Sequence, residues 1–364
     1  MGSTRVESVG VVGAGVIGMS IAFELASTGV EVVVIDPAPG QGASWAAAGM
    51  LAPAGEVGPG EAGLLRDLVD AAARWPRFAE RVLEAGGSDV GYRTSGSVLV
   101  GATASDTRDV ARTVDLMRAA GIVVEPLNGD ELSEREPSLA ASLRGAWLLP
   151  GDHSVDNRRL VMGLLEALKA LGARIVEDRC AEIVMEPLGP RLTLERQGDV
   201  RCDRCVLATG AAVPIAGTAA LGLPAVRPVR GQTLRLGAVE GVEVPTSPVR
   251  AVVESAPCYL VPRGDGSLVV GATSEEQGYR ELALAGGVHR LLDAARQVFP
   301  GIDELSFDGT SVGLRPATAD HLPFVGRLRD ERVVAAVGHY RNGILLAPLA
   351  AATAAALVMG ASCE

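Results

Sequence analysis

The stretch ESVGVVGAGVIGMSIAFEL, residues 7–25, decides how this chain folds. Its short apolar residues Val9 to Val12 are typical of a buried strand, and the residues after Gly18 follow with helical spacing. Between the two, Gly13, Gly15 and Gly18 match the pattern G-x-G-x-x-G. The first glycine permits a tight turn, the second lets a pyrophosphate approach the backbone, and the third lets the helix pack closely against the strand. We therefore expect a helix N-terminus that binds the phosphates of a dinucleotide.

A second strand supports this interpretation. The segment EVVVID begins at Glu31 and ends at Asp36. An acid at this position accepts a hydrogen bond from a ribose 2′-hydroxyl and repels a 2′-phosphate, so NADP is disfavoured. Glycine is common in this chain (45 of 364 residues), and an ordinary glycine-rich turn beside a solvated Asp36 is the alternative. The order strand, glycines, helix, strand, acid favours the nucleotide, although the loop alone does not separate NAD from FAD.

Composition limits the classes of partner. A chain of 364 residues with 48% hydrophobic residues is long enough for two domains or one large one. The net charge of −11 argues against non-specific binding of nucleic acid or of an anionic membrane surface. Five cysteines without dense spacing indicate a reducing compartment, so we expect a cytoplasmic protein. Cys202 and Cys205 form a single C-x-x-C without a second ligand pair, and no metal site is expected.

Neither end of the sequence predicts a membrane segment. The first nine residues contain no apolar run, so no signal peptide is expected. Residues 344–361 carry no charge over a length that could cross a bilayer, but they are mostly alanine. A buried helix packed on a sheet explains this composition better than a membrane span does.

The order of predicted elements gives the fold class. Strand–helix–strand patterns dominate both ends of the chain, whereas the middle is rich in strands, including a hairpin around Gly264-Asp265-Gly266. We expect an α/β (mixed α+β) protein with a Rossmann-like FAD-binding domain and a smaller, mostly antiparallel-sheet substrate domain. The FAD-binding domain would comprise residues 1–90, 141–225 and 308–364, and the substrate domain residues 91–140 and 226–307. A helix is expected over 153–172, with an aspartate near its start.

Three later motifs favour a flavin. CVLATGA (205–211) is a strand that returns small residues to the nucleotide, and VGLRPATADHLPFVG (312–326) is a strand that ends in Arg-Pro. VGHYRNGILLAP (337–348) is a strand, a turn and a second helix start. Reduced flavin carries negative charge near its pyrimidine oxygen, and the N–H groups of a helix start stabilise such charge.

These motifs, together with GASWAAAGMLAP, HSVDNRRL and YLVPR…VVGATSEE, occur in one order along almost the whole chain. In them the sequence resembles the D-amino-acid oxidase superfamily of flavoproteins, and within it the glycine oxidase branch of the thiamin pathway. The resemblance implies non-covalently bound FAD and hydride transfer from the substrate α carbon to flavin N5. The product imine would hydrolyse to a 2-oxo acid and ammonia, and O2 would be reduced to H2O2. We expect a small amine or amino acid and O2 as partners, no nucleic acid or membrane, and a homo-oligomer.

The resemblance also implies which residues contact FAD. They are Gly13, Ala14, Gly15, Val16, Ile17, Gly18, Asp36, Ala43, Ser44, Ala47, Ala48, Gly49, Met50, Leu51, Cys180, Ala181, Ala208, Thr209, Gly210, Arg315, Gly338, His339, Tyr340, Arg341, Asn342, Gly343 and Ile344. For His339 we expect contact through its backbone rather than acid–base work.

The expected catalytic and substrate-binding residues are few. Arg315 ends a strand beside the expected flavin, and its planar fork of donors suits a substrate carboxylate. Tyr259 could bind the same carboxylate, and Arg341 could contact substrate or flavin or gate the site. The alternatives are a structural arginine paired with an acid, an ordinary half-buried tyrosine and, for Met50, plain core packing. No catalytic triad is required, because the protein contributes position, charge and dry surroundings.

Two positions depart from the glycine oxidase pattern. Pro257 stands where some glycine oxidases carry a histidine, and Ser274 stands where a methionine lines the pocket in some members. Ser274 is thus expected to line the substrate pocket, and both changes would make the substrate side of this pocket roomier. Glycine or a related amine is therefore the expected substrate, with a larger glycine-bearing compound of secondary metabolism as the alternative. A flavin dehydrogenase, a subunit of an oxidase complex, a flavin-stabilised binding protein and an NAD dehydrogenase are the other classes left open.

Overall fold

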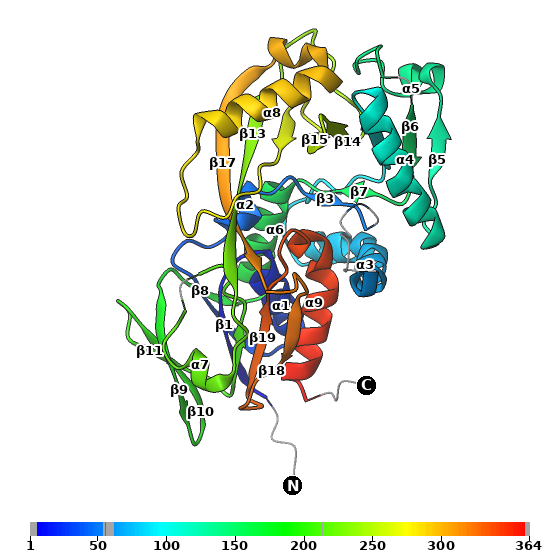
Figure 1. Ribbon diagram of the computed structural model, residues 1–364. Coiled ribbons are helices and arrows are strands. Elements are labelled where there is room, and N and C mark those ends of the chain that lie inside the picture. Colours follow the sequence, from blue (N-terminus) through cyan, green and yellow to red (C-terminus); the bar gives the residue numbers. More distant parts are fainter. Residues whose placement is uncertain (1–5, 54, 56–61, 144, 213, 361–364) are drawn as a thin grey trace.

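The structure is a computed structural model that describes residues 6–53, 55, 62–143, 145–212 and 214–360. Its first sheet has six strands, and the glycine-rich stretch lies at its centre (Figure 1). In spatial order the strands are β18 (Phe324–Arg327), β19 (Val333–Val337), β12 (Arg204–Leu207), β1 (Ser8–Val12), β2 (Glu31–Ile35) and β8 (Arg174–Val176). All neighbouring pairs are parallel except β18 with β19. This is the parallel sheet that the first motif predicts, and the predicted fold class is confirmed.

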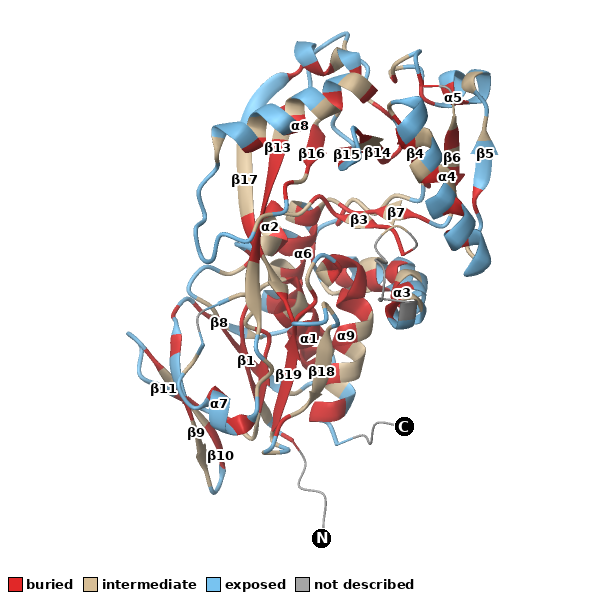
Figure 2. Cartoon of the chain, viewed as in Figure 1, coloured by how far each residue is buried: buried red, intermediate tan, exposed pale blue. Residues whose placement is uncertain are grey.

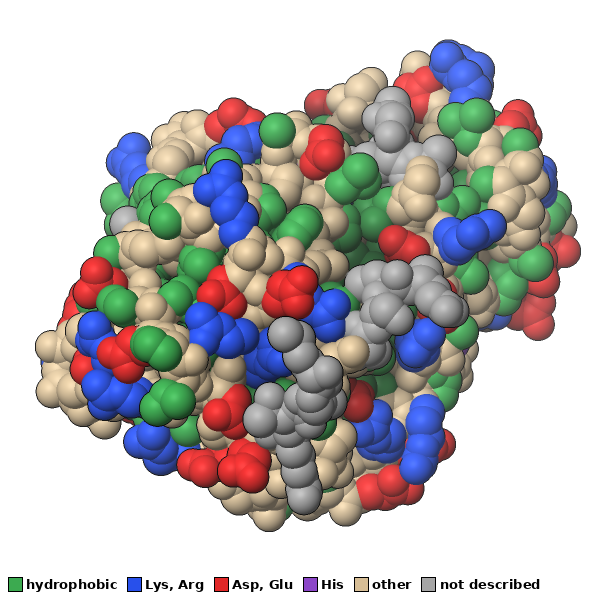
Figure 3. All heavy atoms as spheres, turned by 90° about the horizontal axis from the view of Figure 1, so that it is seen from below, with side chains coloured by type: hydrophobic (Ala, Val, Ile, Leu, Met, Phe, Trp, Pro, Cys, Tyr) green, Lys and Arg blue, Asp and Glu red, His purple; other side chains and the backbone are tan. Residues whose placement is uncertain are grey.

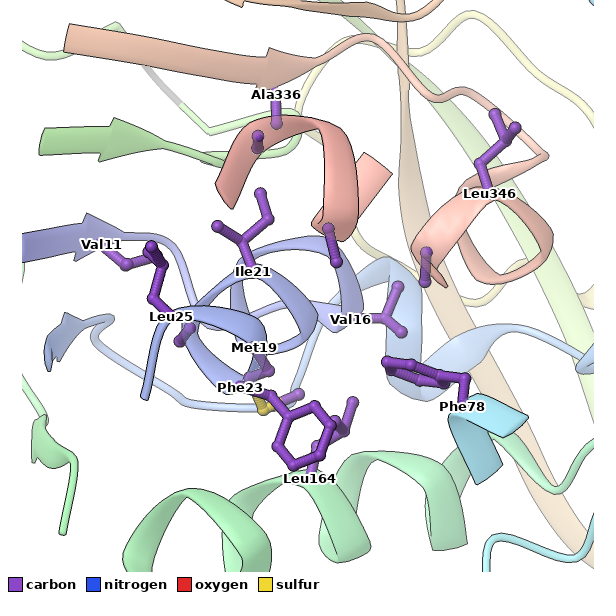
Figure 4. Packing of buried hydrophobic residues seen from close by; sticks show 14 of the residues in the cluster. Val11, Val16, Met19, Ile21, Phe23, Leu25, Phe78, Leu164, Ala336 and Leu346 are labelled. Carbon is purple, nitrogen blue, oxygen red and sulfur yellow. The ribbon is translucent and has the colours of Figure 1, made fainter. Parts of the chain in front are cut away.

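Helices cover one face of this sheet and a small meander covers the other. Helix α1 (Val16–Ala26) packs between the sheet and helices α6 (Asn157–Ala170) and α9 (Gly343–Val358). Figure 4 shows Ile21 and Phe23 of α1 on opposite sides of the helix, toward Ala336 of β19 and toward Leu164 of α6. The meander consists of β9 (Cys180–Glu186), β10 (Gly189–Leu194) and β11 (Asp199–Arg201). Because α1 is buried on nearly every side, its start is held rigidly at the edge of the sheet.

The second sheet has eight strands and is mostly antiparallel. In spatial order they are β17 (Ser306–Ala317), β13 (Arg227–Gly237), β16 (Leu268–Gly271), β15 (Ala256–Pro262), β14 (Val249–Val253), β4 (Ser97–Gly101), β6 (Ala146–Leu149) and β5 (Glu125–Leu127). One face packs its leucines and valines under helix α8 (Ala285–Val298), whose outer side is exposed (Figure 2). The other face is turned toward the nucleotide half, where the short helix α2 (Ala43–Ala46) lies on β17.

The remaining elements are short strands, helices and turns that lie between the strands of the sheets in the sequence. They are β3 (Met50–Leu51), β7 (His153–Ser154), α3 (Leu65–Glu84), α4 (Ala104–Ala119), α5 (Gly129–Arg135), α7 (Thr218–Leu221) and the 3₁₀ turns Ala62–Leu64 and Pro300–Glu304. Helix α4 covers Leu99 of β4, on the face of the second sheet that looks toward the nucleotide half. The face seen in Figure 3 carries basic and acidic side chains interspersed rather than a field of one sign.

The structure corrects the expected start of one helix. The helix expected from residue 153 begins at Asn157, because His153 and Ser154 pair with Met50 and Leu51 as strands. Asp156 then caps the helix, because its side chain accepts from the backbone N–H groups of Arg158 and Arg159. Strands β6 and β17, which the expected boundaries at 141 and 308 assign wholly or mostly to the FAD-binding domain, pair within the eight-stranded sheet. A division into two domains stays a prediction, and we propose to assign β6 and β17 to the substrate unit.

The alanine-rich segment near the end forms α9, which is buried against α1 and α3. Trp75 of α3 donates its indole N–H to the carbonyl of Leu345 at 2.9 Å. Among the described residues, no helix combines the length and the apolar character that crossing a bilayer requires. The expectation of a buried helix at this position is confirmed.

Candidate functional site at the meeting of the two sheets

The glycine-rich turn has no room for a side chain at two of its three glycines. Gly13 has φ of +106°, and a Cβ there would lie 2.2 Å from the carbonyl oxygen of Ala208. A Cβ on Gly18 would lie 1.9 Å from the carbonyl oxygen of Gly13. At Gly15 the closest contact of such a Cβ among the described residues outside its own helix turn is the hydroxyl of Ser44, at 3.3 Å. Gly13 and Gly18 thus shape the turn, while Gly15 leaves its outer side open to a ligand.

Asp36 is fixed beside this turn at the end of β2. Its carboxylate accepts from the backbone N–H of Ala14 at 2.7 Å and from that of Ala38 at 2.8 Å. Each carboxylate oxygen has a further lone pair that can accept from a hydroxyl. The structure therefore places the predicted ribose acceptor against the loop that would hold the pyrophosphate.

The strand β12 brings Ala208, Thr209 and Gly210 to the same edge. The N–H of Ala208 donates to the carbonyl of Val12, and the methyl group of Ala208 would lie 3.3 Å from a Cβ on Gly18. Gly210 turns the chain with φ of +60°. Small residues here let the turn pack directly on the glycine-rich loop.

The segment from Ala43 to Leu51 runs between the two sheets. Ser44 is buried, and its hydroxyl accepts from the N–H of Val16 in the first turn of α1 at 2.9 Å. Gly49 has φ of +80°, and a Cβ there would lie 2.1 Å from the carbonyl oxygen of Val155. Ala47, Ala48 and Met50 then lead into the two-residue strand β3. The segment thus joins the helix start of one sheet to the substrate face of the other.

Three polar residues that sequence reasoning missed hold this segment in place. The buried amide of Asn157 donates to the carbonyls of Ser44 and Trp45, at 2.8 and 2.9 Å. Arg235 donates to the carbonyl of Ala47 at 2.7 Å, and Arg263 to that of Ala48 at 2.8 Å. Burial, and then repulsion from Arg263, lower the pKa of Arg235 to about 9. The sequence did contain a signal for the two arginines, because each lies in or next to an otherwise apolar strand. An arginine in such a strand is buried only when it has partners.

The last turn before α9 faces the same edge of the first sheet. Gly338 has φ of +77° and Tyr340 φ of +49°, and Asn342 precedes the helix without capping it through its side chain. His339 is buried, and burial lowers its pKa to about 4. Within the described part of the chain, His339 Nε2 and Asn342 Oδ1 are buried without a hydrogen-bond partner. Gly343 and Ile344 begin the helix, whose first turn carries no acid.

These residues fit FAD. The cradle at Gly13 to Gly18, the acid at Asp36 and the start of α1 suit the adenosine and pyrophosphate groups. The unpaired polar atoms of His339 and Asn342 need a partner, because a buried polar atom without one is costly. The role of His339, expected to contact FAD through its backbone, stays a prediction.

Arg315 lies on the face of the second sheet that looks toward the nucleotide half. Its Nη1 donates to the carbonyl of Thr273 at 3.0 Å, and its guanidinium lies over Gly231 of the neighbouring strand β13. A Cβ on Gly231 would be 2.4 Å from that Nη1. Within the described part of the chain no acid forms an ion pair with Arg315, so the alternative of a structural arginine paired with an acid has no support here.

Tyr259 likewise lies over a glycine of the neighbouring strand, in this case Gly271 of β16. It pairs directly with Gly271 of β16, and its hydroxyl would be 2.4 Å from a Cβ on that glycine. Gly271 in turn pairs with Thr233, two residues from Gly231. The two strand glycines are diagonal neighbours about 7–8 Å apart, so the tyrosine hydroxyl and the Arg315 guanidinium lie over neighbouring positions on one face of the sheet. Met50 packs with Tyr259 around Val261 and Val269.

The other predicted residues lie further from this pair. Ser274 is exposed, just beyond β16, and Pro257 is exposed on the face of β15 that also carries Tyr259. Arg341 is exposed, with its guanidinium 5.4 Å from the ring centroid of Tyr340. Cys180 is buried at the start of β9, and burial raises its pKa to about 11. The carbonyl of Ala181 already accepts from the N–H of Ala216 at 3.1 Å.

A parallel sheet that ends in a glycine-rich turn fit for a dinucleotide, joined to an antiparallel sheet whose Arg315 lies on the face turned toward it, is the arrangement expected of a two-part flavoprotein. The family model described as FAD dependent oxidoreductase matches residues 8–357, and the chain belongs to this family. The predicted resemblance is thereby confirmed at the level of the family.

The chain is similar to particular members of that family. It is 34% identical to a bifunctional protein ThiO/ThiG of Synechocystis over 96% of its length, which is 51% of that relative, so the chain spans about half of it. It is 33% identical to glycine oxidase of Geobacillus kaustophilus over 96% of this chain and 92% of that one.

Two solved structures are similar as well. The crystal structure of glycine oxidase from Geobacillus kaustophilus gives a TM-score of 0.88 at 33% identity, over 99% of this chain and 96% of that one. The crystal structure of iminodiacetate oxidase from Chelativorans gives a TM-score of 0.84 at 25% identity, over 98% of this chain and 96% of that one.

Proposed function

We propose that this chain is an FAD-dependent oxidase of glycine or of a related amine that carries a carboxylate next to the reacting carbon. The observation that carries the proposal is the placement of Arg315. Its guanidinium has no acidic partner among the described residues and lies over Gly231, on the sheet face turned toward the nucleotide cradle. The similarity to glycine oxidases and to an iminodiacetate oxidase supports an amine next to a carboxylate as the substrate.

The chain's own residues would bind and orient the substrate. Arg315 would hold the carboxylate through two parallel hydrogen bonds, and the hydroxyl of Tyr259 would reach the same carboxylate from the neighbouring strand. Met50 and the wall around Val261 and Val269 would exclude water from the reacting carbon. Burial lowers the pKa of His339 to about 4, which makes it a weak proton acceptor, so we expect the substrate amine to bind in its neutral form.

Bound FAD would supply the chemistry by accepting two electrons from the substrate and passing them to O2. The α carbon loses a hydride and the nitrogen loses a proton, which forms an imine. Water then adds to the imine and splits it into a 2-oxo acid and an amine or ammonia. The balance for an N-substituted glycine is one O2 and one water consumed, with glyoxylate, a primary amine and H2O2 formed. Non-covalent attachment of FAD and a role in thiamin synthesis belong to the same proposal.

The proposal is tested on the purified protein with FAD. We expect a yellow holoprotein that consumes O2 and releases equimolar H2O2 and 2-oxo acid with glycine, sarcosine or D-alanine. Acid precipitation should leave the yellow colour in the supernatant if FAD is not covalently attached. Substrate that bleaches the protein under anaerobic conditions, without O2 uptake in air, would instead identify a dehydrogenase. A protein that neither consumes O2 nor is bleached by any of these substrates would contradict the proposal.

A further inference from the structure

The face that carries Arg315 and Tyr259 holds a second arginine. Arg250 of β14 pairs directly with Tyr259 of β15, so the two side chains leave the sheet on the same face, with Cβ atoms about 5 Å apart. Beyond Arg250 the same face is occupied by helix α4, which packs on Leu99, the partner of Arg250 in β4. Arg250 is therefore the last side chain of this row before the face is covered.

Among the described residues, no acid balances the charge of Arg250. Arg230 and Arg227 of β13 pair with Glu275 and Glu276, whereas no ion pair among the described residues includes Arg250. Its Nη2 donates to the carbonyl of Gly55, and its Nη1 is buried without a partner in the part of the chain that the structure describes. A buried cationic donor without a partner is costly, which favours an anionic ligand at this place.

The spacing of the strands fits one molecule between the two arginines. The Arg315 fork lies over β13, and β16 and β15 separate β13 from β14, so the two supporting strands are about 14 Å apart. Tyr259 lies between them. Two carboxylates joined by a chain of about three atoms, each with hydrogen bonds of about 2.8 Å to a guanidinium, fill such a gap.

We propose that Arg250 binds a second anionic group of the substrate, and that the preferred substrates are N-substituted glycines whose substituent ends in a carboxylate. The proposal rests on the proposed function. Arg315 and Tyr259 hold the glycine carboxylate, and Arg250 holds the carboxylate of the N-substituent. With N-(carboxymethyl)glycine, the balance is one O2 and one water consumed, with glycine, glyoxylate and H2O2 formed.

The first experiment compares two substrates of equal shape on the holoenzyme: N-(carboxymethyl)glycine and its monoamide, N-(carbamoylmethyl)glycine. For the wild type we expect kcat/KM to be at least about 10-fold higher for the diacid, as for a charge-assisted pair. In Arg250→Gln this ratio should fall to about one, and in Arg250→Lys it should lie between. Arg135→Gln removes the same charge from an exposed helix of the same half and should keep the wild-type ratio.

The second experiment needs no turnover. Calorimetric titration of the holoprotein with diglycolate and with its monoamide measures the same preference on unreactive ethers, and the Kd ratio should collapse in Arg250→Gln. A wild type that does not prefer the diacid, or a preference that persists in Arg250→Gln, would overturn the assignment of Arg250. Failure of the proposed function is distinguishable, because no O2 uptake would then occur with sarcosine or glycine, whatever the titrations show.

Discussion

The guanidinium of Arg315 lies over Gly231, in space that any side chain at position 231 would fill. Gly231 and Arg315 belong to neighbouring antiparallel strands, and Gly231 pairs with Gly313, two residues before the arginine. The candidate carboxylate site is therefore made by two residues that are 84 positions apart in the sequence. A glycine inside a strand often marks such a close approach.

Gly231→Ala should displace the arginine without unfolding the protein. The atom that a Cβ would meet is the far end of a flexible side chain, so we expect a change in the free energy of unfolding within about 1 kcal/mol. A displacement of about 1 Å in a positioning group lowers kcat/KM about 100-fold. Steady-state kinetics and thermal unfolding measure the two effects. Gly264→Ala is the matched control, because a Cβ there meets nothing within 4 Å; equal activity of both variants would contradict the role of Gly231.

Arg315→Lys should keep FAD and lose most activity. An ammonium cannot reproduce the planar fork, and loss of a desolvated charge pair costs about 3–5 kcal/mol, which is two to three decades or more in kcat/KM. The visible spectrum reports FAD content, and steady-state kinetics report the loss. If Arg315→Ala turned over small amino acids at a near-normal rate, the carboxylate would have to bind elsewhere, and Arg341 would be the next residue to replace.

Asp36→Ala should weaken FAD binding by about 1–3 kcal/mol, because a ribose hydroxyl and the N–H of Ala14 both lose a charged acceptor. Asp36→Asn keeps one acceptor oxygen and should weaken FAD binding by a smaller amount. Titration of apoprotein with FAD, followed by flavin fluorescence, gives the Kd. Asp115→Ala on the exposed side of α4 is the control. An unchanged Kd in Asp36→Ala would place the ribose elsewhere.

His339 should make the stability depend on pH. Burial lowers its pKa from 6.5 to about 4, so between these values the unfolded chain binds a proton that the folded chain does not. The free energy of unfolding should therefore fall as the pH is lowered from about 6.5 to about 4, by about 3 kcal/mol in total. In His339→Gln this contribution to the pH dependence of the free energy of unfolding should be absent.

Denaturant unfolding at several pH values between 4 and 7 measures this effect. Burial also lowers the pKa of His153, so the difference between wild type and His339→Gln isolates the contribution of His339. His289→Gln, at an exposed position of α8, should leave the profile unchanged. A profile for His339→Gln that parallels the wild type would show that His339 is not buried as a neutral group.

The sequence alone determined the nucleotide half of this protein. The strand, the glycine turn, the helix and Asp36 lie within 30 consecutive residues, from Glu7 to Asp36, and local spacing decides which of them meet. The family and the individual residues Arg315 and Tyr259 could be inferred in the same way, from motifs that each occupy one short stretch. The buried helix at the end followed from its composition.

Only the tertiary structure decided what surrounds the substrate. Arg315 meets Gly231, Tyr259 meets Gly271, and Arg250 stands beside Tyr259 because of the order and register of β17, β13, β16, β15 and β14. Asn157, Arg235 and Arg263 meet the carbonyls of the 44–48 segment because the two sheets are packed together. Spacing along a strand tells which face a side chain occupies, but not which strand lies beside it, since that choice is made by hydrogen bonds between segments far apart in the chain.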